Sequence, residues 1–115
     1  MSVQGVLDAL QASLATTYPG RYADLAHRAG TVAASVALDR VQWDTACDPY
    51  PCRVTATVVL TAAQSGGAGA RDLGGHLERA AALIRAAGWA VDEAQPADVD
   101  DLPALQITAI TDTTA

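Results

Sequence analysis

The sequence predicts an α+β domain in which two helices pack on one face of a mostly antiparallel four-stranded sheet, in the order α-β-β-α-β-β. Apolar residues recur at helical spacing in two separate segments, and in each they occupy one side only. Alternating apolar and polar residues mark strands in two adjacent pairs, as in hairpins. The chain has 115 residues, the size of one domain, so residues 1–115 are predicted to form a single domain.

The first element is a short amphipathic helix. Ser2 is suited to cap its start, and Gln4, Asp8 and Gln11 lie on the polar side. Pro19-Gly20 then breaks the pattern and predicts a turn. The apolar side of this helix is formed by Val3, Val6, Leu7, Leu10 and Leu14.

The next segment fits two periodicities, helical from Leu25 onward and strand-like from Val32 onward. Gly30 separates them, so we expect a helical turn over Tyr22 to Arg28 and a strand over Thr31 to Leu38. Past Asp39 the apolar residues change from even-numbered to odd-numbered positions, at Val41 and Trp43. A switch of parity within a strand predicts a β-bulge or a bend at this point.

Asp48-Pro49-Tyr50-Pro51 predicts a rigid turn, and the clearest strand of the chain follows it. One face of this strand is wholly aliphatic, and the other carries threonines together with Val59. A strand that is apolar on both faces needs cover on both. Two readings stay open: Val59 is an ordinary half-buried valine, or a neighbouring subunit covers it.

Ser65 to Gly69 is rich in glycine and predicts a flexible loop before the second helix. Gly88 is placed to end that helix as its C-cap. The apolar stripe of the helix is formed by Leu73, Leu77, Ile84 and either Ala80 or Ala81.

Two strands complete the sheet. Trp89 to Val91 begins a short strand, and an acidic loop around Pro96 to Asp101 follows it. Alternation then predicts a last strand, in which apolar residues recur at every second position. Its inward residues are Leu105, Ile107 and Ala109.

The composition excludes some classes of function. Thirteen acidic and seven basic side chains give a net charge of −6, which argues against a protein that binds nucleic acid by neutralising phosphates. The chain has no phenylalanine and only two tryptophans and three tyrosines, so its core must be built from small aliphatic residues and is expected to rely on a partner. No secretory signal or membrane-spanning run is recognised, and synthesis in the cytoplasm is expected.

Cys47 and Cys52 flank the predicted Asp-Pro-Tyr-Pro turn. A disulfide, two metal ligands and buried free thiols all remain open for this pair. A structural zinc site needs four ligands at paired spacings, and only the distant His27 and His76 are left to complete it. The prediction is therefore no metal site.

Neither a catalytic site nor a cofactor site is predicted. Ser65 has no histidine near it in sequence, and His76 falls within the second helix. The glycine loop has no following lysine to bind phosphate, and the acidic residues after Val91 do not follow the spacing of an EF-hand. The sequence thus favours a protein that is not an enzyme.

An arginine and aromatic cluster brackets the turn between the first two strands. Such residues often anchor protein interfaces, so they are the predicted contact residues. The acidic residues before the last strand are expected to form a solvated loop, and if subunits repeated it around a ring, it would give a negative rim or channel that repels DNA and lets it slide. The predicted interface residues are Arg40, Trp43, Tyr50, Arg53 and Val59, and the predicted acidic rim residues are Asp98, Asp100 and Asp101.

The order of elements, the small size and the amphipathic opening helix resemble the bacteriophage tail-terminator family. The stretch Val41-Gln42-Trp43-Asp44 with Cys47, Cys52 and the strand VTATVVL also looks like minor neck or tail proteins of phages of GC-rich Gram-positive hosts. The longer connection from Thr16 to Gly30 departs from the plainest form of the pattern.

The resemblance implies a homo-oligomeric ring, a hexamer, that caps the tube of a long tail. One face of the ring would meet the tail tube protein and the other the head-completion protein of the neck. DNA would pass through without specific binding, and the protein would reside in the virion. The alternatives are another head-tail connector, neck or minor tail protein and, from other classes, a small cytoplasmic binding module or an enzyme.

Overall fold

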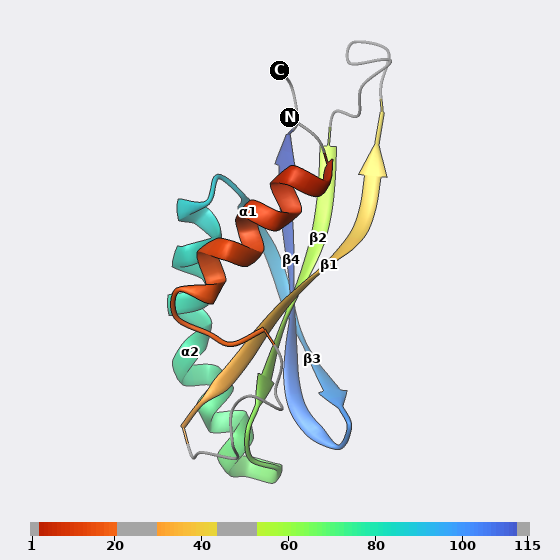
Figure 1. Cartoon of the computed structure of the whole chain (residues 1–115). Coiled ribbons are helices and arrows are strands. Elements are labelled where there is room, and N and C mark those ends of the chain that lie inside the picture. Colours follow the sequence, from red (N-terminus) through yellow and green to blue (C-terminus); the bar gives the residue numbers. More distant parts are fainter. Residues whose placement is uncertain (1–2, 21–29, 44–52, 113–115) are drawn as a thin grey trace.

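The computed structural model describes residues 3–20, 30–43 and 53–112. Within them the chain forms two helices and four strands in the order α-β-β-α-β-β, as predicted (Figure 1). The elements are α1 (Val3–Ala15), β1 (Val32–Gln42), β2 (Arg53–Ala62), α2 (Gly66–Ala86), β3 (Ala90–Val99) and β4 (Leu102–Asp112).

The four strands form one sheet in the order β1-β2-β4-β3, and every neighbouring pair is antiparallel. Both helices lie on the same side of this strongly twisted sheet (Figure 1). The predicted α+β class is therefore confirmed. The strand order leaves β1 and β3 at the two edges of the sheet.

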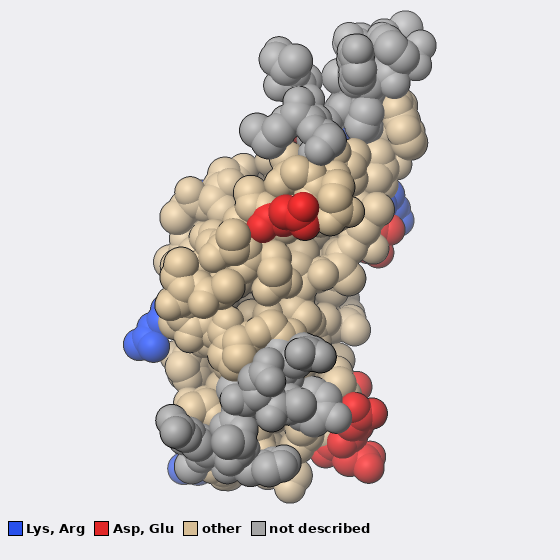
Figure 2. Space-filling model, viewed as in Figure 1, with Lys and Arg blue, Asp and Glu red and all other residues tan. Residues whose placement is uncertain are grey.

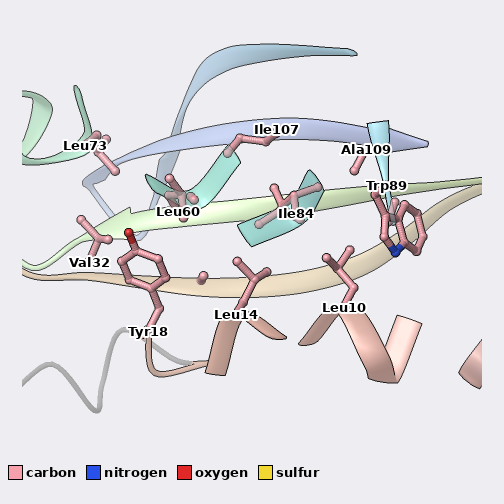
Figure 3. Packing of buried hydrophobic residues seen from close by; sticks show 14 of the residues in the cluster. Leu10, Leu14, Tyr18, Val32, Leu60, Leu73, Ile84, Trp89, Ile107 and Ala109 are labelled. Carbon is pink, nitrogen blue, oxygen red and sulfur yellow. The ribbon is translucent and has the colours of Figure 1, made fainter. Parts of the chain in front are cut away.

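The core lies between the helices and the inner face of the sheet (Figure 3). Leu10 and Leu14 of α1 and Ile84 of α2 are fully buried against Leu60 and Ile107 of the central strands. Burial of each large aliphatic side chain stabilises the fold by roughly 1.5–3 kcal/mol. The helical spacing of these residues in the sequence explains why each helix presents a single apolar side.

The start of α2 differs from the sequence prediction. The loop expected over Ser65 to Gly69 is wrong, because the helix begins at Gly66. Gly69 lies so close to other chain segments that a Cβ atom there would be 2.0 Å from the Gln64 carbonyl oxygen and 2.9 Å from Cγ of Pro103. The glycine thus permits close packing of the helix, which offsets its low helix propensity.

The end of α2 follows the prediction. Gly88 has a φ of +93°, a conformation that glycine adopts without strain. Its amide donates to the Arg85 carbonyl oxygen at 3.0 Å, and the Trp89 amide donates to that of Ile84 at 3.2 Å, the paired bonds of a Schellman motif. This turn directs Trp89, only 4% exposed, into the core. Trp89 therefore precedes β3 and does not begin it, contrary to the prediction.

The first strand is longer than predicted and runs through Gln42. Its register against β2 shifts between Leu38 and Arg40, so the bulge inferred from the change of parity at Asp39 is confirmed. Because a bulge adds one residue on one strand, the apolar residues change parity but stay on the same face, with Leu38 opposite Ala56 and Val41 opposite Val54. Ser2, the helical turn over Tyr22 to Arg28 and the turn over Asp48 to Pro51 lie outside the described residues.

The acidic loop predicted over Pro96 to Asp101 is also wrong. β3 continues through Pro96 to Val99, and β4 begins at Leu102. Only Asp100 and Asp101 form the connection, with φ of +50° and +67°. Positive φ at both central residues fits a two-residue type I′ hairpin turn, for which aspartate is among the preferred residues.

Candidate assembly surface

The first half of the β1 edge is covered by the chain itself. The Gln11 side chain of α1 reaches this edge, where its Nε2 donates to the Ala34 carbonyl oxygen at 3.3 Å and its Oε1 accepts from the Val36 amide at 3.1 Å. The Ala34 amide donates to the Pro19 carbonyl oxygen at 2.9 Å. These contacts occupy backbone groups that would otherwise be available to another strand.

The second half of β1 lacks such cover among the described residues. Leu38 belongs to the row that faces the helices, yet it is 50% exposed, and Trp43 just beyond the strand is 57% exposed. These two are the large hydrophobic side chains that the described part of the chain leaves exposed. Arg40 lies between them in sequence and is exposed as well, but it is opposite Thr55 and so belongs to the other face of the sheet. We call Leu38, Arg40 and Trp43 the distal β1 patch.

Two of the predicted interface residues therefore belong to this patch. Arg40 and Trp43 lie at the end of β1, and Arg53 is adjacent, because it pairs with Gln42 across the sheet. Arg53 also forms an exposed ion pair with Asp112, with 3.8 Å between Nε and Oδ1. Exposed pairs of this kind contribute little to stability, so this arginine can exchange its partner at small cost.

The remaining predicted site residues do not lie in this patch or lie outside the described part of the chain. Val59 is half-buried and lies further along β2, opposite Ser35 and Gln106 on the sheet face away from the helices. It does not belong to the distal β1 patch. Tyr50, Cys47, Cys52 and His27 lie outside the described residues.

The centre of the sheet face that carries Val59 is polar and uncharged, and charged residues lie at its margins. Its central residues are small or neutral, and two threonines, Thr55 and Thr61, are themselves buried with exposed fractions of 8% and 5%. Neither helix covers this face (Figure 1). Other residues of the face are Ser35, Thr57, Val59, Gln106 and Thr108.

The opposite edge strand, β3, carries features that oppose pairing. Pro96 lacks an amide proton, and the register against β4 is irregular between Val91 and Glu93. The carboxylates of Asp92, Glu93 and Asp98 are exposed along the strand. A proline, a bulge and a row of charges are established ways in which proteins protect a sheet edge.

The predicted acidic rim residues do lie together. Asp98, Asp100 and Asp101 are exposed at the turn between β3 and β4. Figure 2 shows acidic side chains gathered there, while the rest of the visible surface carries few charges. We call these three residues the acidic tip.

His76 has a structural environment. Its Nδ1 lies 3.1 Å from the Tyr18 hydroxyl and its Nε2 lies 2.9 Å from the Gly30 carbonyl oxygen, so both ring nitrogens have partners. Burial raises the pKa of Tyr18, and the nearby Arg79 partly opposes that shift. The Gly30 amide also donates to a carboxylate oxygen of Asp72 at 3.1 Å. These bonds fasten the segments on both sides of residues 21–29 to α2.

The described residues contain no group of three or more histidine, cysteine, aspartate or glutamate side chains placed to hold a metal ion. The same residues include no helix long and apolar enough to span a membrane. The sequence prediction missed two residues that matter at the β1 edge: Leu38, which belongs to the strand, and Gln11 of α1, which contacts it. Leu38 fits the inward row of its strand and Gln11 the polar side of its helix, so neither carried a distinguishing signal.

Comparison with known proteins identifies no relative of this chain. No family model, no curated protein and no solved structure matches this chain. The two edges of the sheet and the exposed residues at its ends are therefore the features that bear on function.

Proposed function

We propose that this chain is a structural protein that works by self-assembly, as the ring-forming tail terminator of a bacteriophage. The observation that supports self-assembly is the distal β1 patch, where Leu38 and Trp43 are exposed at a strand edge that the described residues leave uncovered. Aromatic and arginine side chains in such a position are enriched in protein interfaces. An exposed strand edge offers backbone groups to a second chain.

The assignment to a tail terminator goes beyond self-assembly. It is supported by the α-β-β-α-β-β order on which the resemblance depends and by the net charge of −6. A ring that carries negative charge toward its channel repels DNA and lets it pass. In this proposal the ring, a hexamer, caps the tail tube, contacts the head-completion protein and has no catalytic role.

Light scattering on the purified chain, followed by negative-stain electron microscopy, tests this proposal. The expected result is a mass of several subunits and annular particles, with six copies in each ring. A strict monomer at high protein concentration would contradict self-assembly and favour a small binding module. A symmetric dimer without rings would keep self-assembly but contradict the tail terminator.

A further inference from the structure

In the distal part of β1, from Leu38 to Gln42, backbone groups point outward from the edge of the sheet. The Ala34 and Val36 amides point away from β2, since other parts of the chain accept their hydrogen bonds there. Backbone groups alternate sides along a strand, so those of Leu38 point the same way. Beyond the bulge the alternation resumes at Val41, whose partner on β2 is two residues from that of Leu38.

These outward groups are open to a second strand. Among the described residues, none hydrogen-bonds to the outward backbone groups of Leu38 and Val41, and no helix lies along the outer side of this part of β1 (Figure 1). Both residues also carry apolar side chains on the helix side of the sheet. A strand edge with unpaired backbone groups and apolar side chains is a template for pairing with another chain.

Two opposite charges lie next to each other in the bulge. Asp39 and Arg40 are both exposed, and neither forms an ion pair with a described residue. An acid followed directly by a base is self-complementary in antiparallel pairing, because the acid of each strand then lies opposite the base of the other. Opposite charges directly across two strands stabilise the pairing, and like charges destabilise it.

We propose that the distal part of β1 pairs antiparallel with the same segment of a second copy, about a two-fold axis between Asp39 and Arg40. In this register Asp39 of each copy lies opposite Arg40 of the other, and Leu38 lies opposite Val41. This inference rests on the self-assembly proposed above and is independent of the assignment to a tail terminator. A two-fold contact by itself closes a dimer, so a ring of six copies needs a second contact between three such pairs.

The bulge selects this register. A bulge in one strand ordinarily disturbs pairing at an edge, but here the extra residue of each strand faces that of the other. Outward backbone groups therefore meet outward groups on both sides of the axis, and helix-side residues meet helix-side residues. At the outer ends, Trp43 of each copy lies beside Val36 of the other. Any other register sets a bulge against regular strand and brings opposite faces together beyond it.

Charge reversal tests the contact. Asp39→Arg gives an edge with two positive charges and Arg40→Asp an edge with two negative ones, so two copies of either variant meet with like charges at both central positions. Each single variant is expected to dissociate about tenfold or more readily than wild type in sedimentation experiments over a range of protein concentrations. The double variant, in which the charges are exchanged, is expected to recover most of the wild-type affinity.

A mixture of the two single variants gives the sharpest result. Asp39→Arg is complementary to Arg40→Asp at both central positions, so native mass spectrometry of an equimolar mixture should show pairs that contain one copy of each variant in excess of pairs of identical copies. If β1 instead bound a different surface of the next copy, mixing would restore nothing, because that surface is unchanged in both variants.

Matched controls use the adjacent exposed charges Glu78 and Arg79 on α2. Glu78→Arg and Arg79→Glu change charge by the same amount away from the β1 edge. These controls are expected to leave assembly within about threefold of wild type, because exposed distant charges are screened. Circular dichroism confirms that every variant is folded.

The outcomes separate the two proposals. A wild-type chain that stays monomeric overturns both the self-assembly and this contact. A wild-type chain that assembles, together with a double variant and a mixture no better than the single variants, overturns the contact alone. A wild-type chain that responds to charge reversal as expected but forms no rings supports the contact and overturns the tail terminator.

Discussion

The two edge strands of the sheet differ in how their outer edges are protected. β3 carries Pro96, an irregular register near Asp92 and a row of exposed carboxylates. β1 is covered over Ala34 and Val36 by contacts from Gln11 and Pro19, and its second half exposes Leu38 and Trp43. Since both strands are edges of one sheet, the contrast supports the proposal that the distal part of β1, which no described residue covers, binds another chain.

The comparison also separates two kinds of protection. On β3 the protection is local and resides in the strand's own sequence, whereas on β1 it depends on a side chain from a helix 23 and 25 residues away in sequence. Protection by a distant element can be removed by one substitution without changing the strand. Each of the following predictions alters one of these features and measures the consequence.

The largest effect on stability is expected from Gln11→Ala. This change leaves the Ala34 carbonyl and the Val36 amide without their side-chain partner at a partly buried site, and an unsatisfied buried polar group costs about 1–3 kcal/mol. Urea unfolding measures the loss. Gln4→Ala is the matched control, because Gln4 lies on the same helix and its side chain donates to the exposed Asp8 carboxylate at 2.8 Å. Equal losses in both variants would contradict the role assigned to Gln11.

A smaller effect is expected from Tyr18→Phe, which removes the hydroxyl that contacts His76 Nδ1. Loss of this hydrogen bond is expected to lower the free energy of unfolding by about 0.5–1.5 kcal/mol near neutral pH. Tyr18 precedes Pro19, whose carbonyl covers the Ala34 amide. Loosening Tyr18 therefore also weakens the cover over the first half of β1, which faster hydrogen exchange of the Ala34 amide would report.

The same tyrosine predicts a pH dependence. Burial raises the Tyr18 pKa above its ordinary value of 10.0, so the unfolded chain releases this proton at lower pH than the folded one. The contribution is fully present below pH 10.0 and is lost as pH rises through the folded value. Because the chain has no lysine, few other groups titrate there. Above that pH, the free energy of unfolding of the wild type should fall more steeply with pH than that of Tyr18→Phe. An equal pH dependence in the two proteins would contradict the assignment.

The smallest effect on stability is expected from Pro96→Thr on β3. Threonine restores an amide donor and favours strand conformation, so the free energy of unfolding should change by less than about 0.5 kcal/mol. Light scattering should nevertheless show increased nonspecific association, because the edge has lost one protective feature. Gln95→Thr alters the neighbouring exposed residue without restoring a donor and serves as control. Indistinguishable association of both variants would show that Pro96 does not protect this edge.

Much of the fold could be predicted because its signals are local. The alternation around Val58 and Ile107 located the central strands, and the parity switch near Asp39 located the bulge. Gly88 located the end of α2. In each case one or two neighbouring residues determine the backbone conformation, so the pattern can be read without knowing which distant segments come together.

The errors share a different cause. The glycines before Leu73 predicted a loop, but Gly69 packs closely against Gln64 and Pro103, a contact that no local pattern reveals. The acids and the proline of β3 also resemble a loop, yet pairing with β4 keeps them in a strand. For the candidate site, Arg40 and Trp43 could be named from residue type. The exposure of Leu38 and the contact from Gln11 could not, because both depend on where α1 crosses the sheet.

Sedimentation velocity of two aspartate variants tests most directly whether the distal part of β1 is the assembly edge. Leu38→Asp places a charge on β1, and Ala94→Asp places the same charge on an exposed position of β3. We predict that Leu38→Asp remains folded but sediments as a monomer at concentrations where wild type and Ala94→Asp sediment as closed oligomers. Loss of assembly in Ala94→Asp with retention in Leu38→Asp would contradict the account.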